Sequence, residues 1–343
     1  MTGPIEPLLA IETSCDETAA AVIGPGGVAL SSVVRSQVEE HGQFGGVVPE
    51  LASRRHLEWI DAVVAEALSK AGITLDDVRA VGVTRGPGLV GCLLVGLAWA
   101  QGLCLARNLP LLGVNHLEGH LLASFVGQPL PPFPFLALTV SGGHTSLVRC
   151  DDVGAYEVLG STRDDAAGEA FDKSARLLGL PYPGGVYVDR TSKGGDSTAV
   201  DLPRGMRGKP GYGFSFSGLK TAVWKHIEEH GVPEGQGMND FCASLQEAIV
   251  DALLIKTRKA ARELGIKRVV VTGGVAANSR LRSAFADAAE AEGWELHRPE
   301  MRFCTDNAGM IGYVAWLRMG RGERSPLDVD VAPGLSLGPE PAW

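Results

Sequence analysis

The stretch that decides the fold is Leu8–Gly24, LLAIETSCDETAAAVIG. An apolar run leads into a turn of small and polar residues, and a second apolar run follows, which is the pattern of a β-hairpin. The stretch Phe135–Cys150, FLALTVSGGHTSLVRC, repeats this design with a Gly/Ser turn. Backbone N–H groups and hydroxyls in such turns can bind an anion. Two hairpins of one design predict a chain of two similar halves.

Strand and helix signals alternate after each hairpin. In residues 78–115 an apolar strand, the turn GPGLVG, an apolar helix and a second strand follow one another. In the second half, residues 239–264 have helical periodicity, and residues 267–285 have the pattern of a strand, a glycine turn and a helix. This order predicts a duplicated, two-lobed α/β fold of the actin, Hsp70 and sugar-kinase type, with a nucleotide-sized cleft between the lobes.

The Pro-rich segment Gln128–Phe135, QPLPPFPF, is typical of a linker between two lobes. We therefore expect an N-terminal lobe over residues 1–131 and a C-terminal lobe over 132–324. Residues 325–343 are rich in Pro and Gly, which predicts a loosely ordered tail.

Charge and cysteine usage limit the class of protein. The net charge of the 343 residues is −9, which argues against a general nucleic-acid coating protein but does not exclude a nucleic-acid substrate. Basic residues still cluster locally, above all between Lys256 and Arg268. The six cysteines form no CxxC pair and the N-terminus does not have the pattern of a signal peptide, so we expect a protein of the reducing cytoplasm.

The segment Gly88–Ala106 is long and uncharged enough to suggest a membrane span. Recurring glycines, a strand directly before it and the lack of a basic flank favour a helix buried on most sides between protein layers. We therefore expect no membrane partner.

The turn Gly86–Gly91, GPGLVG, matches the G-x-G-x-x-G pattern of dinucleotide sites. Such a site needs an acidic residue about 20 positions later, at the end of the second strand. Here the second strand ends GVNH, and the first acid is Glu118. A tight turn with close helix packing is the better interpretation.

Two further glycine pairs, in Thr139–His144 (TVSGGH) and Thr272–Asn278 (TGGVAAN), directly follow strands. The second opens a helix, whose N-terminus can receive a phosphate or a ribose. Either turn alone is as consistent with a plain loop, but both together with the turn ETSCDET favour a nucleotide-like ligand. Asp172 lies on a predicted helix and is either an exposed charge or an acceptor for ribose hydroxyls.

The stretch Asn115–His120, NHLEGH, places two histidines at i and i+4, on one face of a helix. A zinc peptidase needs Glu directly after the first histidine, where this chain has Leu117, and Glu118 points away from the histidine face. Two histidines alone are often satisfied core residues. Asp306, in the expected second lobe, adds a carboxylate, and this ligand set suits Fe(II), with Zn(II) and Mn(II) as alternatives.

The sequence as a whole resembles one known family, and the resemblance runs in order from about Leu8 to Gly320. The motifs that carry it are IETSCDET, GGVVPELASRRH, GPGLVG, NHLEGHL, VSGGHT, DDAAGEAFDK, YPGG, FSFSGLKT, TGGVAAN and CTDNAGM. They are similar to the signatures of the TsaD family, the bacterial tRNA N6-adenosine threonylcarbamoyltransferases formerly labelled O-sialoglycoprotein endopeptidases.

The resemblance implies a metal-dependent acyltransferase of the actin-like fold. It implies transfer of a threonylcarbamoyl group from threonylcarbamoyl-AMP to N6 of the adenosine 3′ of the anticodon (adenosine 37), which forms t6A in tRNAs that read codons beginning with A. The resemblance also implies two protein partners, a paralogous actin-like subunit of the TsaB type and a small ATPase of the TsaE type. A separate synthase would make the donor.

The resemblance also assigns roles to individual residues. The metal ligands would be His116, His120 and Asp306. The ligand-binding residues would be Thr139, Val140, Ser141, Gly142, Gly143, Asp172, Gly184, Asp189 and Asn278, of which Asp189 rests on the resemblance alone.

For the reaction itself, the exocyclic nitrogen of adenine is a poor nucleophile, so a nearby carboxylate, Asp16 or Glu12, is a candidate general base. A small-molecule kinase or a carbamoyltransferase of the same fold remains the alternative function.

Overall fold

The computed structural model describes residues 5–338, which divide into two compact units. The first unit draws its described residues from within Met1–Pro131, Asp152–Tyr156 and Pro299–Trp343. The second consists of Pro132–Asp151 and Glu157–Arg298. Each unit contains one five-stranded mixed sheet with helices, so the predicted α/β class and its duplication are confirmed.

The sheet of the first unit has the strand order β3-β2-β1-β4-β5. As the hairpin pattern predicts, β1 pairs antiparallel with β2, and it pairs parallel with β4 on its other side. The strands are β1 (Leu8–Glu12), β2 (Glu17–Ile23), β3 (Ala29–Ser36), β4 (Ala80–Gly86) and β5 (Leu111–Asn115). The α-helices are α1 (Val38–Gly42), α2 (Pro49–Ala71), α3 (Val90–Arg107), α4 (His116–Leu122) and α10 (Ala308–Gly320), with 3-10 turns at Pro25–Gly27, Ala123–Phe125 and Met301–Phe303.

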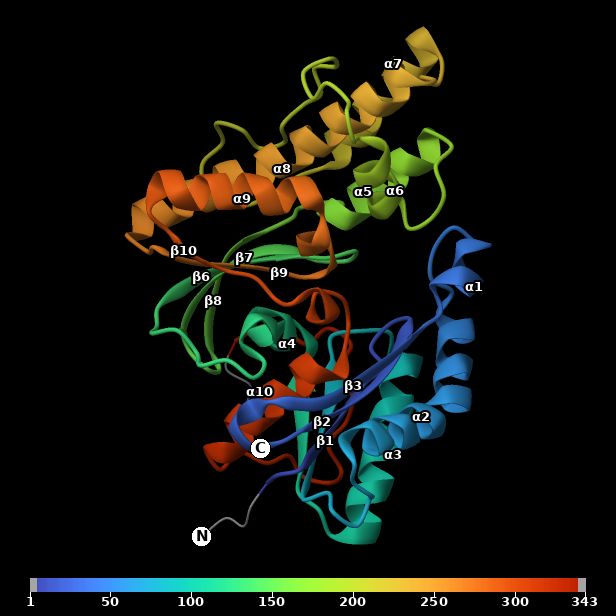
Figure 1. Cartoon of the computed structure of the whole chain (residues 1–343), viewed down its shortest axis with the longest axis vertical. Helices are drawn as coiled ribbons and strands as arrows, with labels where there is room; N and C mark the ends of the chain where they lie inside the picture. The colour runs from blue at the N-terminus through green and yellow to red at the C-terminus, as the bar shows by residue number, and fades with distance from the viewer. Residues whose placement is uncertain (1–4, 339–343) are drawn as a thin grey trace. The chain divides into compact units, whose positions relative to one another are not determined.

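Helices cover both faces of this first sheet. Figure 1 shows α2 and α3 on one side of β1–β3 and α10 on the other. The apolar side chains of α2 and α3 form one core with residues such as Leu9, Ile11 and Val83. On the opposite face α10 approaches very closely, because a Cβ on Gly312 would lie 2.5 Å from Ile23 Cγ1 and 2.8 Å from Ala10 Cβ.

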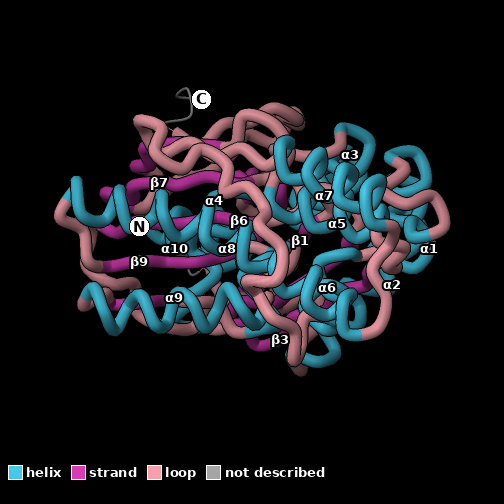
Figure 2. Tube along the Cα trace, turned by 90° about the horizontal axis from the view of Figure 1, so that it is seen from above, coloured by secondary structure: helices cyan, strands magenta, loops and turns pink. Residues whose placement is uncertain are grey.

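The second unit repeats this plan with the strand order β10-β9-β6-β7-β8, where β6 and β7 form the predicted hairpin. Figure 2 shows α9 running alongside β9, and α8 and α9 share a core with β6 and β9. The strands are β6 (Phe135–Val140), β7 (Thr145–Asp152), β8 (Ala155–Ser161), β9 (Arg268–Thr272) and β10 (Glu295–His297). The helices are α5 (Ala167–Leu177), α6 (Gly184–Thr191), α7 (Ser217–His230), α8 (Gln236–Leu264) and α9 (Ser279–Glu292), with a 3-10 turn at Gly274–Ala277.

The C-terminal segment departs from the expected lobes. The first stretch of unit 1 ends at Pro131, where the linker was expected, but the chain from Pro299 onward returns to unit 1. The reason is that α10 is almost wholly apolar, with nine buried residues, and it covers the open face of β1, β2 and β4. Asp306 therefore belongs to unit 1 and not to the second lobe.

The segment from Ser325 to residue 338 is ordered, contrary to the expected loose tail. Ser325 N donates to Leu111 O along β5, and Ala332 N donates to Arg85 O beside β4. Val329 is only 5% exposed in the core of α2 and α3. These backbone hydrogen bonds to β5 and β4 hold the Pro/Gly-rich segment in place. The sequence of the segment therefore shows neither helical nor strand periodicity, although the segment is ordered. Residues 339–343 lie outside the described part of the chain.

The apolar helix α3 is buried on one face rather than on most sides. Cys92, Leu93, Leu97 and Ala100 are among its buried residues, and they pack against β4 and α2, whereas Leu105 is 74% exposed. Among residues 5–338, α3 is the one helix long and apolar enough to cross a membrane, and core helices of soluble proteins often pass this test. Its contacts with the sheet favour a packed helix.

Candidate metal centre and ligand loops

Helix α4 begins directly where β5 ends, and its first turn is fixed by Asn115. The Asn115 side chain accepts hydrogen bonds from Leu117 N at 2.9 Å and Glu118 N at 3.4 Å, which makes Asn115 the N-cap. His116 is thereby the first helical residue and His120 lies one turn later. Both imidazoles are buried.

The third member of the cluster, Asp306, precedes the N-cap of α10, Asn307. Its Oδ1 lies 3.1 Å from His120 Nε2 and 3.5 Å from His116 Nε2. The two imidazole rings stand edge to face, with centroids 4.8 Å apart. The structure therefore brings the three ligand atoms predicted from the sequence within 4.8 Å of one another, inside unit 1.

This cluster fits a divalent transition-metal ion. Metal bonds of about 2.0–2.2 Å to imidazole and carboxylate place neighbouring ligand atoms roughly 3.0–3.5 Å apart in tetrahedral or octahedral geometry. The two separations that involve Asp306, 3.1 and 3.5 Å, lie in that range, and all three ligand atoms lie within 4.8 Å of one another. Two imidazoles and a carboxylate match the ligand preferences of iron, zinc and manganese.

Glu12 lies behind His116, on the side of the ring that carries Nδ1. His116 Nδ1 donates to Glu12 Oε2 at 3.0 Å, and Glu12 also accepts hydrogen bonds from Ser14 N and Thr84 Oγ1. The side chain has no exposed surface. With both of its oxygens engaged, it is unsuited to the general-base role considered above. A carboxylate on the rear nitrogen of a histidine instead fixes the ring so that Nε2 points forward.

Electrostatics show that the site is built to hold positive charge. Burial alone would raise the pKa of Asp306, but the two imidazoles hold it well below its usual range. Burial alone would lower the pKa of His116, but Asp306 and Glu12 hold it well above its usual range. Both pKa shifts favour positive charge at this position.

Sequence reasoning missed the residues that support the turn between β1 and β2. His56 of α2 donates from Nε2 to Cys15 O at 2.9 Å, and its Nδ1 accepts from Thr18 Oγ1 at 2.7 Å. The turn also carries Asp16, which is 8% exposed, and Ser14, whose Oγ lies 3.1 Å from His116 Nδ1. A single histidine on a helix forms no pattern that would predict the role of His56. The motif SRRH, which contains it, is the one signal in the sequence that could have pointed to this residue.

In unit 2 the two glycine turns lie side by side at the ends of the parallel strands β6 and β9. A Cβ on Gly273 would lie 2.4 Å from Val140 O, so only glycine allows this approach. The N-terminus of α5 is also close, because a Cβ on Gly168 would lie 2.7 Å from Ser141 O. Around Gly142 and Gly143 there is open space instead. Ligands bind to open α/β sheets at this edge, beyond the carboxyl ends of the strands.

The other predicted ligand residues surround the same edge but make internal contacts. Asp172 accepts from Gly184 N at 2.7 Å and caps α6. Asp189 accepts from Ser279 N at 3.2 Å, at the start of α9. Asn278 caps α9 through Leu281 N and donates to Gln246 Oε1 at 2.7 Å. In the structure these three candidates therefore stabilise the starts of α6 and α9.

The turn GPGLVG is filled by protein, as the tight-turn interpretation predicts. A Cβ on Gly86 would lie 1.9 Å from Ala332 O, and one on Gly88 would lie 2.6 Å from Ser14 O. No room remains there for a dinucleotide phosphate. The glycines instead allow the C-terminal segment and the β1–β2 turn to approach.

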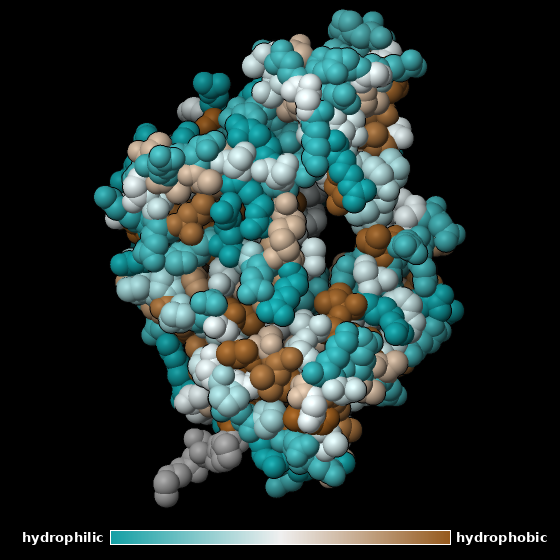
Figure 3. Space-filling model, viewed as in Figure 1, coloured by the Kyte–Doolittle hydropathy of each residue, from teal (hydrophilic) through white to brown (hydrophobic). Residues whose placement is uncertain are grey.

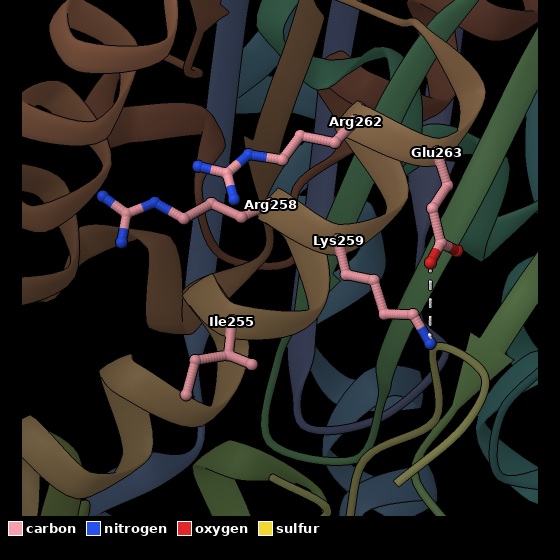
Figure 4. A pocket seen from close by; sticks show the side chains of 5 residues that line it. All are labelled: Ile255, Arg258, Lys259, Arg262 and Glu263. Carbon is pink, nitrogen blue, oxygen red and sulfur yellow. Dashed lines mark ion pairs between the residues drawn. The ribbon is translucent and has the colours of Figure 1, made fainter. Parts of the chain in front are cut away.

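A basic surface lies on the last turns of α8. Figure 4 shows Arg258, Lys259 and Arg262 projecting from this helix around a shallow pocket of about 370 Å³. Lys256 is buried and donates to Lys209 O and Gly211 O at 3.0 and 3.1 Å, which holds a neighbouring loop against the helix. Three of these cations share two carboxylates: Lys259 pairs with Glu263, and Arg258 and Arg262 both pair with Glu292.

Comparison with solved structures shows the class of protein. HypF of T. kodakarensis aligns with 92% of this chain and 48% of its own length at a TM-score of 0.63 and 14% identity. The (R)-2-hydroxyglutaryl-CoA dehydratase component A of Acidaminococcus fermentans aligns over 92% and 99% at a TM-score of 0.55 and 14% identity. The fold is that of the actin-like ATPases.

Sequence comparison shows the family within this class. Residues 28–313 match the profile described as TsaD, tRNA N6-adenosine threonylcarbamoyltransferase. A protein of that name from Anaeromyxobacter sp. strain Fw109-5 is 55% identical over 98% of this chain and 99% of its own. One from Geobacter sulfurreducens is 54% identical over 94% and 95%. The chain belongs to the TsaD family.

Proposed function

We propose that this protein transfers a threonylcarbamoyl group from threonylcarbamoyl-AMP to N6 of adenosine 37 in tRNAs that read codons beginning with A, which forms t6A. The observation that carries the proposal is the cluster of His116, His120 and Asp306 in a member of the TsaD family. In this reaction N6 attacks the carbonyl carbon of the mixed anhydride and the bond to the phosphate oxygen breaks. AMP leaves, and the N6 proton passes to a base.

His116, His120 and Asp306 would hold one divalent metal ion, with Fe(II) preferred. When bound, the ion would supply Lewis-acid polarisation and orientation of donor oxygens. Glu12 holds His116 in the orientation that presents Nε2. Asp16 remains our candidate for the general base, since it lies in the turn whose Ser14 contacts His116.

The remaining roles fall to unit 2 and to partners. The open space around Gly142 and Gly143, next to the N-terminus of α5, suits a nucleotide phosphate. The net charge of −9 repels the phosphate backbone of tRNA, so binding needs a local basic surface. The basic surface of α8 suits this role. A TsaB-type subunit and a TsaE-type ATPase would assist turnover in the cytoplasm.

The test is mass spectrometry of nucleosides from unmodified tRNA. The purified protein, its partner proteins, threonine, bicarbonate, ATP and the donor synthase would be incubated with the tRNA. Wild type, His116→Ala and the surface control His230→Ala would be compared. We expect t6A with wild type and His230→Ala, and none with His116→Ala.

Two results would contradict the proposal in different ways. Product from all three proteins would leave the transferase in place but remove the metal centre from it. No product from any of them, with partners that are active alongside a known family member, would favour a small-molecule kinase or carbamoyltransferase. A kinase of this fold would show ATP turnover that does not depend on His116.

A further inference from the structure

Helix α4 carries a buried carboxylate between its two histidines. Glu118 is 2% exposed, and a carboxylate buried without a partner strongly destabilises a fold. Its Oε1 accepts from Tyr156 Oη at 2.9 Å, and its Oε2 accepts from Arg318 Nη1 at 3.0 Å. Both oxygens therefore have a partner. All three residues belong to unit 1, because that unit includes Asp152–Tyr156, the turn between β7 and β8.

Arg318 is fixed from its other side as well. It lies near the end of α10, and it also binds Glu323, with Nη2 2.6 Å from Oε2. The guanidinium thus joins two carboxylates and is itself mostly buried. Because the planar guanidinium donates in fixed directions, it restricts where the Glu118 carboxylate can lie.

Because Glu118 lies on α4, its ion pair with Arg318 restricts the rotation of that helix about its axis. The helix has seven residues, fewer than two turns, and its internal hydrogen bonds do not set its rotation about its own axis, so contacts with neighbouring residues must do so. Residues two apart lie on opposite sides of a helix, so Glu118 faces away from His116 and His120. A rotation that broke the ion pair with Arg318 would turn both imidazoles away from Asp306. Close packing supports the same arrangement, since a Cβ on Gly119 would lie 2.9 Å from Ile311 Cδ1.

We propose that the Glu118–Arg318 ion pair, supported by Tyr156, is the positioning device of the metal centre. It holds α4 in the rotation that points both histidines at Asp306, and Asp306 and Arg318 lie at the two ends of the same helix segment. Glu118 touches neither the metal nor the substrate in this role. This inference rests on one part of the proposed function, the binding of a metal ion by His116, His120 and Asp306.

The test is titration of the purified full-length protein with Co(II), whose visible absorption reports ligand geometry. The variants are Glu118→Gln, Arg318→Met, the double variant and the milder Tyr156→Phe. The matched control is Arg321→Met, which removes an exposed ion pair with Asp152 near the same end of α10 but does not reach α4. Unfolding midpoints of the metal-free proteins would be recorded in parallel.

We expect Glu118→Gln and Arg318→Met each to weaken Co(II) binding about 10–100-fold and to change the absorption spectrum. The double variant should bind little more weakly than either single variant, because both remove one interaction. Tyr156→Phe should show a smaller effect in the same direction even if the other variants fold poorly. Arg321→Met should bind as wild type does.

Two outcomes would overturn the inference, and they are distinguishable. If wild type binds Co(II), His116→Ala does not, and the Glu118 and Arg318 variants keep wild-type affinity and spectrum, then the ion pair only stabilises the fold. If wild type and His116→Ala bind Co(II) equally, or neither binds it, the metal centre of the proposed function fails together with its positioning device.

Discussion

Glu12 and His116 are 104 residues apart in the chain, yet Glu12 Oε2 accepts a hydrogen bond from His116 Nδ1 at 3.0 Å in a buried environment. This hydrogen bond joins the first strand of the chain to the first residue of α4. It leaves Nε2 of the imidazole directed at Asp306. The hairpin that opens the fold therefore also orients one residue of the candidate metal centre.

Replacement of this carboxylate by an amide should weaken metal binding. In Glu12→Gln the amide NH2 can donate to Nδ1, which moves the ring hydrogen to Nε2 and blocks the ligand atom. We expect Co(II) affinity to fall about 10–100-fold, measured by titration. Glu50→Gln, at an exposed glutamate on α2, is the control. Unchanged affinity in Glu12→Gln would rule out the positioning role of Glu12.

Two helical glycines in unit 1 should respond to alanine with opposite signs. Gly312→Ala places a methyl group 2.5 Å from Ile23 Cγ1, so we expect the free energy of unfolding to fall by about 1–3 kcal/mol. A Cβ on Gly102, in α3, would have no atom within 4 Å. Because alanine favours the helix over glycine, we expect Gly102→Ala to raise the free energy of unfolding by about 0.5–1 kcal/mol. Urea unfolding measures both. A neutral Gly312→Ala would contradict the close packing of α10 on β1 and β2.

The basic surface of α8 should contribute to the salt dependence of tRNA binding. Lys259→Ala combined with Arg262→Ala should flatten the plot of log affinity against log salt by about 0.7–0.9 for each phosphate that these side chains neutralise in the wild type. The matched control combines Lys70→Ala with Arg54→Ala on α2, which also removes one lysine and one arginine with glutamate partners. Equal slopes for both double variants would place the tRNA elsewhere.

Asp164 should stabilise the start of α7 in a pH-dependent way. Partial burial alone would raise its pKa, but hydrogen bonds from Ser215, Phe216 N and Ser217 lower it. A depressed pKa in the folded state contributes stability above the unfolded pKa of about 3.9, and this stability disappears as pH falls through the folded pKa. The helix depends on this cap because only Leu219 and Val223 are buried, and Figure 3 shows mostly hydrophilic surface over α7 at the top of the view.

The measurement for Asp164 is hydrogen exchange of the first turn of α7. Asp164→Asn should increase exchange near neutral pH, and the difference from wild type should shrink as the pH falls below about 4. Asp201→Asn, at a fully exposed carboxylate, should exchange as wild type does. A difference that stayed constant with pH would show that the charge of Asp164 has no part in the cap.

Local patterns in the sequence predict only some parts of this protein. Both hairpins, the glycine turns and the ligand pair His116 and His120 follow from spacing within one short segment. The hydrogen bond of Glu12 to His116 and the return of α10 to unit 1 do not, because each joins residues more than 100 positions apart. An apolar helix such as α10 fits either sheet equally well in sequence. Specific contacts in unit 1, such as the close approach at Gly312 and the ion pair of Arg318 with Glu118, select one of them.

The discontinuity of unit 1 has a consequence for biosynthesis. Domains generally fold as units while the ribosome is still adding residues. The stretches of unit 2 end at Arg298, so its sheet can be completed before synthesis finishes. Unit 1 must wait for α10, which supplies one face of its core and follows directly after the metal cluster's Asp306. A released chain that ends before residue 306 would therefore retain every strand of the second sheet but could not assemble the candidate ligand set.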